Sequence, residues 1–454
     1  MIILKFGGSS LADPECVKRV ASIVKRAANR KLVVVVSALG KTTDRLVAVA
    51  QAAVESDVEA QIEALRADHL EISARVVAGP DLSQSTAFLG DCFEELQQHC
   101  KDISACGTLT PTMSDAVLSL GERMSSYIVA LALRSHGLDA VSFDSREVIV
   151  TDDRHSEACP LFDPTNQRLQ SYVRPLVEQE KVPVLGGFIA STEGGVTSTL
   201  GRGGSDYTAS IVGAALNAQE VQIWTDVDGV MTADPSLVEE AHRIRRMSFA
   251  EASELAYFGA RVLHPSTMAP ALENEIPIRV LNSRRPEIEG TVITRELPKT
   301  DAVAKSIAYK EGITIVDIRS MRMLMAHGFL ARIFNVFEEH GTAVDMVTTS
   351  EVSVSLTVDR TDQLDAIAGK LSEVAQVELR RNQAIVCIVG EGIRHAHGIS
   401  AKIFSALEGI HIAMISVGAS RLNVSFVVDE ADLSEAVSRL HRMLFAEIDP
   451  EVFA

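Results

Sequence analysis

Short apolar runs alternate with helical repeats through the first sixty residues. Met1–Phe6 is apolar at every position except Lys5. A helical spacing of apolar residues follows, at Val17, Val20, Ile23 and Val24. Leu32–Ser37 is a β-branched run without polar alternation, as expected of a parallel strand that is covered on both faces. Strands that alternate with helices in this way predict an α/β fold with right-handed crossovers.

The same pattern continues to about residue 296. Residues 55–135 are rich in Glu, Gln, Leu and Ala and predict mostly helix. Further strand-like runs occur at Ala140–Phe143, Val148–Val150, Val182–Ile189, Val221–Thr225 and Ile278–Leu281. The polar, proline-bearing segment 296–301 predicts a linker. We therefore expect a first domain over residues 1–296, with an open, mostly parallel sheet sandwiched by helices, and a second domain over residues 302–454.

An internal repeat with an offset of 70 residues occupies the second domain. Ala331–Phe334 matches Ala401–Phe404, and Ser353–Asp359 matches Asn423–Asp429 in the same register. Each copy reads strand, helix, strand, strand, helix, which is typical of a ferredoxin-like βαββαβ module. Two such copies predict a ligand or partner cleft between them.

The acidic composition narrows the range of partners. The chain has 454 residues, with 61 Asp and Glu against 43 Lys and Arg, which gives a net charge of −18. This balance argues against nucleic-acid binding and against a basic membrane patch, but it allows a small anion at a local positive site. We see no targeting segment, no apolar run of membrane-spanning length and no CxxC spacing among six cysteines. We expect a cytoplasmic protein with no membrane or nucleic-acid partner.

One candidate phosphate site stands at the end of the first strand. Neither GxxxxGK[ST] nor a strand-associated GxGxxG occurs, so the common nucleotide motifs give no support. Lys5 instead precedes Gly7, Gly8 and Ser9, and a helix follows. Two glycines let the backbone approach a phosphate, and the Lys adds a positive charge. The alternative is a tight strand–helix turn with an exposed Lys.

Two further polar segments follow strands. Residues 199–208 combine three glycines with Arg202, Ser205 and Asp206 before a helix, where the Arg suits a carboxylate and the polar side chains suit helix capping. Residues 224–230 run from a strand into an acidic turn. A flexible loop and a solvated Asp-Gly turn are the respective alternatives. Glu122, which we place near a helix start, is by itself an ordinary capping carboxylate.

Taken together, these segments resemble the aspartate kinases of the amino-acid kinase superfamily. The resemblance rests on KFGGSS at the N-terminus, SALGKTT at 37–43, LGRGGSDYTA at 200–209, WTDVDGV at 224–230 and FGARVLHP at 258–265. Residues 328–359 resemble that family's first ACT regulatory module. The length leaves no room for the homoserine dehydrogenase fused to some members. The resemblance implies ATP-dependent phosphorylation of the β-carboxylate of L-aspartate, the first step of the aspartate-family amino-acid pathway.

The resemblance also implies roles for individual residues. Lys5 would contact the transferring phosphoryl group, and Asp206 would organise the transfer site. Gly7, Gly8, Ser9 and the loop 37–40 would cradle phosphates. Aspartate would be held by Thr42, Glu122, Phe188, Arg202 and Ser205. The nucleotide would contact Thr225, Asp226, Asp228, Gly229, Met231 and Arg261, although the family usually has Tyr at the position of Met231 and Lys at that of Arg261. ATP and Mg²⁺ are the implied cofactors, with no metal held directly by side chains.

For the repeat, the resemblance implies feedback regulation. Lysine, with threonine as the alternative, would contact Met323, Gly328, Phe329, Leu330, Asp345, Ser350 and Glu351. The first ACT module, about residues 312–382, would be inserted into a second made of residues 302–311 and 383–454. A homodimer or homotetramer would form through these modules. The rival interpretations are another kinase of the same fold, such as glutamate 5-kinase or acetylglutamate kinase, and a catalytically silent amino-acid sensor.

Overall fold

The computed structural model describes residues 1–259, 265–296, 302–321, 327–359, 361–393 and 396–454. The chain forms two compact units. The N-terminal unit comprises Met1–Val230, Arg245–Phe249 and Val262–Leu297. The C-terminal unit comprises Met231–Ile244, Ala250–Arg261 and Pro298–Ala454, so it takes in two segments from the middle of the chain. The domain boundaries given above stay a prediction.

An eight-stranded sheet organises the N-terminal unit. Its order is β3-β5-β2-β1-β8-β10-β11-β9, and its strand pairs are parallel except for the antiparallel pair of β10 and β11. The strands are β1 (Ile2–Phe6), β2 (Leu32–Val36), β3 (Ala140–Phe143), β5 (Val182–Gly186), β8 (Glu220–Thr225), β9 (Arg246–Ser248), β10 (Ile278–Asn282) and β11 (Thr291–Thr294). The expected open, mostly parallel sheet is confirmed.

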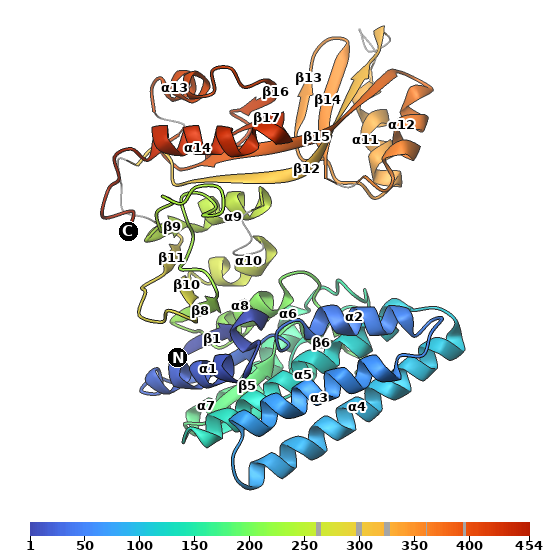
Figure 1. Ribbon diagram of the computed structural model, residues 1–454, viewed down its shortest axis with the longest axis vertical. Helices are drawn as coiled ribbons and strands as arrows, with labels where there is room; N and C mark the ends of the chain where they lie inside the picture. Colours follow the sequence, from blue (N-terminus) through green and yellow to red (C-terminus); the bar gives the residue numbers. More distant parts are fainter. Residues whose placement is uncertain (260–264, 297–301, 322–326, 360, 394–395) are drawn as a thin grey trace. The chain divides into compact units, whose positions relative to one another are not determined.

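The helices of this region follow the predicted pattern. β1 and β2 are buried at every position, as the unbroken apolar runs predicted. Figure 1 shows the long helices α3, α4 and α5 alongside one another, where they share one apolar core with β1 and β2. The helices are α1 (Pro14–Arg26), α2 (Thr42–Ala52), α3 (Glu59–Val76), α4 (Pro80–Cys106), α5 (Pro111–Ser135), α6 (Phe162–Arg168), α7 (Arg174–Glu178), α8 (Gly204–Ala215) and α10 (Pro265–Glu273). Helix α9 (Phe249–Tyr257) belongs, from Ala250 onward, to the C-terminal unit.

Helix α5 qualifies the expectation that the chain has no segment of membrane-spanning character. Among the described residues it is the one helix long and apolar enough to pass such a test by length and composition. Most of its apolar window, 78%, is buried inside the structure, which is what the core helix of a folded domain shows. It also carries buried Asp115 and Glu122. We therefore interpret α5 as a core helix.

The predicted strand Val182–Ile189 is wrong in one respect. The chain forms two strands here, β5 and β6 (Ile189–Thr192), with Gly187 and Phe188 between them. Phe188 has a φ of 67°, which no strand accommodates. β6 joins a small sheet with β4 (Val150–Thr151) and β7 (Thr197–Thr199). Strand β7 lies in the glycine-rich segment 194–205, where the pattern predicted no strand.

A six-stranded antiparallel sheet organises the C-terminal unit, in the order β13-β14-β12-β15-β17-β16. Figure 1 shows α11 and α12 at one end of this sheet and α13 and α14 at the other. The elements are β12 (Ser306–Arg319), α11 (Phe329–Glu339), β13 (Val347–Thr349), β14 (Ser353–Val358), α12 (Leu364–Ser372), β15 (Gln376–Val389), α13 (Ile399–Ala406), β16 (Ile412–Val417), β17 (Asn423–Asp429) and α14 (Leu433–Leu444).

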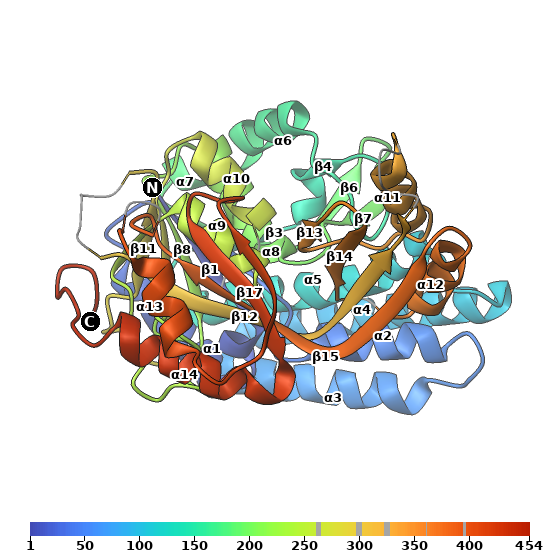
Figure 2. The same ribbon diagram turned by 90° about the horizontal axis from the view of Figure 1, so that it is seen from above.

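Strands β12 and β15 carry the repeat into the structure. Both are 14 residues long, and their bounds differ by 70 residues at each end. They pair antiparallel along their whole length, side by side in Figure 2. The first part of β12 pairs with the last part of β15, next to β17, and the last part of β12 lies next to β14. Each long strand therefore serves both halves of the sheet.

Candidate active site

Lys5 lies beside the glycine loops at the carboxyl ends of the parallel strands. β1 ends at Phe6, and the Gly7 N–H donates to the Trp224 carbonyl at the end of β8, at 3.1 Å. A Cβ atom on Gly8 would stand 2.8 Å from the Gly40 carbonyl oxygen, and the Gly40 N–H donates to the Gly8 carbonyl. The two loops are thus packed backbone to backbone. In open α/β sheets this edge is where ligands bind.

A buried ion pair joins Lys5 to the start of α8. The Lys5 Nζ lies 2.6 Å from the Asp206 Oδ1, and the two side chains are 10% and 15% exposed. Asp206 lies in the first turn of α8, which follows Gly203 in the left-handed conformation. The N-cap is Gly203 and makes no side-chain hydrogen bond, so the expectation of a Ser, Asp or Thr cap is wrong. The structure brings Lys5 and Asp206 together from 201 residues apart.

Glu122 is buried in the middle of α5, not near a helix start as the sequence suggested. The side chain is 3% exposed, and its Oε1 accepts from the Ala38 N–H at 3.1 Å. Its Oε2 is buried with no hydrogen-bond partner among the described residues. Desolvation raises the pKa of Glu122 to about 8, against the Ala38 hydrogen bond and the charge of Lys5. A cation bound at Oε2 would offset the cost of desolvating the ionised carboxylate.

Thr42 and Gly121 show how close α5 comes to the loop after β2. A Cβ atom on Gly121 would lie 2.9 Å from the Ala38 Cβ and 3.6 Å from the Thr42 Cγ2. Thr42 opens α2 and is buried. The predicted substrate residues Thr42 and Glu122 therefore border the same loop.

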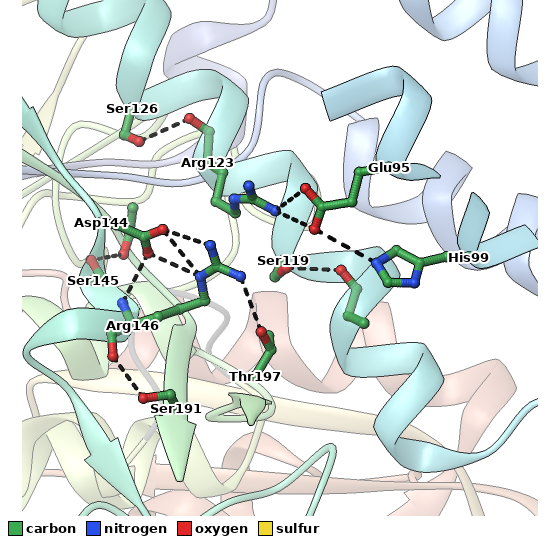
Figure 3. A network of polar contacts seen from close by, with 12 residues as sticks. Glu95, His99, Ser119, Arg123, Ser126, Asp144, Ser145, Arg146, Ser191 and Thr197 are labelled. Carbon is green, nitrogen blue, oxygen red and sulfur yellow. Dashed lines mark hydrogen bonds and ion pairs between the residues drawn. The ribbon is translucent and has the colours of Figure 1, made fainter. Parts of the chain in front are cut away.

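Arg123, next to Glu122, holds α5 to α4 by an ion pair that the sequence analysis missed. Its Nη1 donates to both Glu95 carboxylate oxygens, at 2.7 and 2.8 Å (Figure 3). His99 contacts Glu95 from the next turn of α4, at 3.6 Å. The His99 contact and the Arg123 pair, against desolvation, lower the pKa of Glu95 to about 2. This pair fixes the helix that presents Glu122.

Arg202, Phe188 and Ser205 belong to the connections around the start of α8. Arg202 is exposed between Gly201 and Gly203, each with a φ of 69°. Ser205 packs against Gly187, where a Cβ atom would stand 2.6 Å from the Ser205 Cα. The Phe188 ring likewise packs against Gly204. The structure thus groups Phe188 and Ser205 directly, with Arg202 on the loop between them.

The acidic turn after β8 is partly neutralised. Asp228 Oδ1 accepts from the Asn282 Nδ2 at 2.6 Å, and its Oδ2 pairs with Arg285. Asp226 is exposed, and the Thr225 hydroxyl donates to it at 3.2 Å. Gly229, with a φ of 130°, leaves no room for a Cβ atom, which would stand 2.5 Å from the Thr291 Oγ1. The solvated-turn alternative is therefore wrong for Asp228.

Asp115 is a second buried carboxylate that the sequence analysis missed. It is 0% exposed, one turn into α5, and receives three groups from the segment after β4 and from β7. These are the His155 Nδ1 at 2.8 Å, the Ser156 N–H at 3.0 Å and the Thr199 hydroxyl at 2.6 Å. Asp115 stands seven residues before Glu122, hence on the same helix face, and that spacing was its one sequence signal.

In the C-terminal unit, Asp345 is already paired. Its side chain is 6% exposed, and its Oδ1 lies 2.9 Å from the Lys310 Nζ, which also contacts Asp359 at 2.8 Å. Asp345 Oδ2 is buried with no hydrogen-bond partner among the described residues. Desolvation raises the pKa of Asp345. Burial works against the charge of Lys310, but hydrogen bonds to Asp359 and Asp345 raise its pKa.

The other predicted effector and nucleotide residues of this unit are more scattered. Phe329 packs into the core between α11, α12 and the sheet, so its side chain is not free. Gly328 caps α11, while Leu330, Ser350 and Glu351 are exposed. The carbonyl of Met231 accepts from the Ser306 hydroxyl at 2.7 Å. Arg261 and Met323 lie outside the described residues.

The family models and relatives agree along the chain. The amino acid kinase family matches residues 1–282, and an ACT domain matches residues 316–368 and 386–444. Aspartokinase 1 of Arabidopsis thaliana is 38% identical over 98% of this chain and 80% of its own length. The lysine-sensitive aspartokinase 3 of Escherichia coli is 35% identical over 98% of this chain and 99% of its own.

The chain belongs to the aspartokinase family. Its class is therefore aspartate kinase, a phosphotransferase with a carboxyl group as acceptor. A crystal structure of E. coli aspartokinase III with aspartate and ADP superposes with a TM-score of 0.86, over 98% of this chain and all of that one, at 35% identity. The same enzyme with lysine and aspartate gives a TM-score of 0.82. The amino-acid kinase fold with ACT modules, expected from the motifs and the repeat, is confirmed.

Proposed function

We propose that the N-terminal unit transfers the γ-phosphoryl group of ATP to the β-carboxylate of L-aspartate, giving 4-phospho-L-aspartate and ADP. The observation that carries this is the buried ion pair of Lys5 and Asp206 beside the packed loops of Gly8 and Gly40. The aspartate and ADP bound by E. coli aspartokinase III support the choice of ligands. Residues 1–296 form the catalytic domain in this proposal.

The reaction needs groups that stabilise negative charge more than it needs a general base. The β-carboxylate is already ionised at neutral pH, so it attacks the γ-phosphorus directly, and the bond to the bridging oxygen breaks with its electrons leaving on ADP. Lys5 contacts the transferring group, Asp206 orients Lys5, and the N–H groups of Gly8 and Ser9 face the phosphates. The Gly7 N–H donates to the Trp224 carbonyl, so Gly7 contributes by letting the backbone pass close to the phosphates. Both loops are too tightly packed for side chains, which fits a phosphate cradle.

Magnesium enters this scheme with the nucleotide. The described residues contain no group of three or more His, Cys, Asp or Glu that could hold a metal ion. The phosphate oxygens of ATP and water molecules are the ligands of Mg²⁺ in this proposal, and no side chain holds the ion directly. Bound there, the ion would neutralise phosphate charge.

Aspartate is held by the two charged groups on its α-carbon. Glu122 binds the ammonium group through the buried Oε2 that has no partner among the described residues. Arg202, which is exposed, binds the α-carboxylate as a planar donor. Thr42, Phe188 and Ser205 line the space between them. Thr225, Asp226, Asp228 and Gly229 contact the nucleoside, with Met231 and Arg261 as further contacts.

The C-terminal unit regulates this activity in our proposal. Lysine, or threonine, binds at the first ACT module, about residues 312–382, inserted between 302–311 and 383–454. Asp345 binds the ligand's ammonium group, and Met323, Gly328, Leu330, Ser350 and Glu351 complete the site, with Phe329 contributing its backbone because its ring is packed in the core. A relative's name and the lysine complex of E. coli aspartokinase III support lysine. Exposed Val347, Ile415 and Val417 on the edge strands suit a homodimer or homotetramer. Six free cysteines suit the cytoplasm.

A hydroxylamine-trapping assay tests the function. The chain is incubated with ATP, Mg²⁺ and, in turn, aspartate, glutamate, N-acetylglutamate and acetate, and the acyl hydroxamate is measured. Aspartate alone should give product, and lysine or threonine at millimolar concentration should reduce it. Product with another acid would support the rival kinases, and no product with any acid would support a silent sensor.

A further inference from the structure

Asp115 ties the loop of Arg202 to the helix of Glu122. Its carboxylate lies on α5 and accepts from the Thr199 hydroxyl, three residues before Arg202. It also accepts from the Ser156 N–H through both oxygens, at 3.1 and 3.0 Å. Since a carboxylate can only accept, the His155 Nδ1 carries a hydrogen and donates to it. All its contacts outside α5 therefore converge on two neighbouring segments.

Those two segments clamp the start of the arginine loop. The Ala158 N–H donates to the Thr199 carbonyl at 2.9 Å. A Cβ atom on Gly201 would stand 3.3 Å from the Ser156 carbonyl oxygen, so Gly201 packs directly on the residue that Asp115 holds. Ser156 has a φ of 73°, which is unfavourable for a residue with a side chain and needs support from its surroundings. Asp115 supplies that support by accepting from the Ser156 N–H.

Burial makes this an expensive way to join a helix to a strand. A carboxylate at 0% exposure must recover its hydration free energy from its hydrogen-bond donors, and apolar side chains would join the same elements without that cost. Hydrogen bonds, in contrast with apolar packing, fix direction as well as distance. Asp115 and Glu122 are two turns apart on one face of α5, about 10 Å along the axis. The helix therefore fixes the distance between Asp115 and Glu122.

We propose that Asp115 is a positioning residue which holds the loop of Arg202 in place relative to Glu122, so that the two side chains meet the α-carboxylate and the ammonium group of one aspartate molecule. The inference rests on the proposed roles of Arg202 and Glu122 at these two groups. When the clamp is lost, the arginine loop relaxes and aspartate binds less tightly.

Two variants break the clamp at different points. Asp115→Asn keeps the size but replaces one acceptor by a donor, and Thr199→Val removes only the hydroxyl. Either should raise the KM for aspartate, by about tenfold or more for Asp115→Asn and by about threefold or more for Thr199→Val. The kcat at saturating aspartate and the KM for ATP should stay within about twofold.

The chain offers a matched control in the same strand. Thr197 lies two residues before Thr199, on the same face of β7, and its hydroxyl accepts from the Arg146 Nη1 at 3.1 Å (Figure 3). Thr197→Val removes a comparable hydrogen bond that does not reach Asp115. It should leave the KM for aspartate unchanged. An equal rise in Thr197→Val and Thr199→Val would overturn the inference.

A double-mutant cycle with Arg202→Ala separates positioning from a merely structural role. If Asp115 acts through Arg202, Asp115→Asn should change the aspartate KM of Arg202→Ala by less than about twofold. Additive effects, or a loss of kcat and thermal stability at unchanged KM, would overturn the proposal. If Asp115→Asn does not fold, the cycle with Thr199→Val decides. An unchanged aspartate KM in Arg202→Ala itself would instead refute the proposed role of Arg202.

Discussion

Each unit of the molecule holds a lysine against an aspartate, and the two clusters differ in their net charge. In the N-terminal unit the buried Lys5 faces the single carboxylate of Asp206, in the first turn of α8. In the C-terminal unit the partly buried Lys310 is shared by two carboxylates, Asp345 and Asp359. The first cluster is neutral and lies at a helix N-terminus. The second has a net negative charge.

That difference indicates which ligand each cluster can accept. A neutral pair at the N-terminal turn of a helix attracts anions, because the N–H groups of that turn leave a partial positive charge. A lysine with two carboxylates leaves negative charge over, and the buried Oδ2 of Asp345 has no hydrogen-bond partner among the described residues. An ammonium group would complete it. We therefore expect phosphate at the first cluster and an amino-acid ammonium at the second.

Replacing Lys5 should have the largest effect. Lys5→Met removes the positive charge that contacts the transferring phosphoryl group, so kcat should fall by at least about a thousandfold. The hydroxylamine-trapping assay gives kcat, and far-ultraviolet circular dichroism reports the fold. Lys18→Met, which removes an exposed lysine on α1 paired to Glu15, is the control and should keep full activity. Near-normal turnover of a folded Lys5→Met would show that the neutral pair is only structural.

Replacing Glu122 tests the one site residue of the N-terminal unit that should receive a cation. Glu122→Gln should raise the KM for aspartate by about ten- to a hundredfold, the cost of losing a charged hydrogen bond. The raised pKa of Glu122, about 8, means that its carboxyl group is mostly protonated at pH 7 and ionises as the pH rises. Since the ionised form binds ammonium, the wild-type KM should fall between pH 6.5 and 9. A KM with the same pH dependence in both proteins would contradict the assignment.

The ion pair of Glu95 and Arg123 serves as a comparison for the two lysine clusters, because it holds α4 to α5 and contacts no proposed ligand. Glu95→Gln should lower the free energy of unfolding by about 1–2 kcal/mol at pH 7, allowing for partial exposure. The folded pKa of Glu95 is about 2, below its ordinary 4.5, so its stabilisation is full above pH 4.5 and disappears as the pH falls toward 2. Denaturant titrations at several pH values check this. A stability difference that does not shrink in acid would exclude the ion pair as its cause.

Local signals in the sequence were enough for the sheets and for the glycine loops. The unbroken run Leu32–Val36 reads as a covered parallel strand, and the 70-residue offset reproduces β12 and β15. The split at Phe188 could not be predicted, because its positive φ depends on the Thr208 hydroxyl, which accepts from the Phe188 N–H 20 residues away in sequence. Strand β7 was hidden in a glycine-rich stretch.

The residues of the candidate site also differ in how well the sequence predicts them. Lys5, Gly7 and Asp206 stand in segments whose glycines mark them, whereas Asp115 looks like any acidic residue in a first turn. Lys310 lies in the middle of a strand, and its partners are 35 and 49 residues further on. Ion pairs between distant segments exist only once the chain is folded, so pattern alone does not reveal them.

A calorimetric comparison of Lys5→Met and Lys310→Met tests the assignment of ligand sign most directly. Each variant and the wild type are titrated with a non-hydrolysable ATP analogue and Mg²⁺, and separately with lysine and with threonine. Lys5→Met should raise the Kd of the nucleotide by about tenfold or more and leave the amino-acid Kd within about twofold. Lys310→Met should leave the nucleotide Kd unchanged and lower the amino-acid Kd, because the ligand's ammonium group no longer competes with Lys310. Equal loss of nucleotide binding in both variants, or an amino-acid Kd that only Lys5→Met changes, would contradict the account.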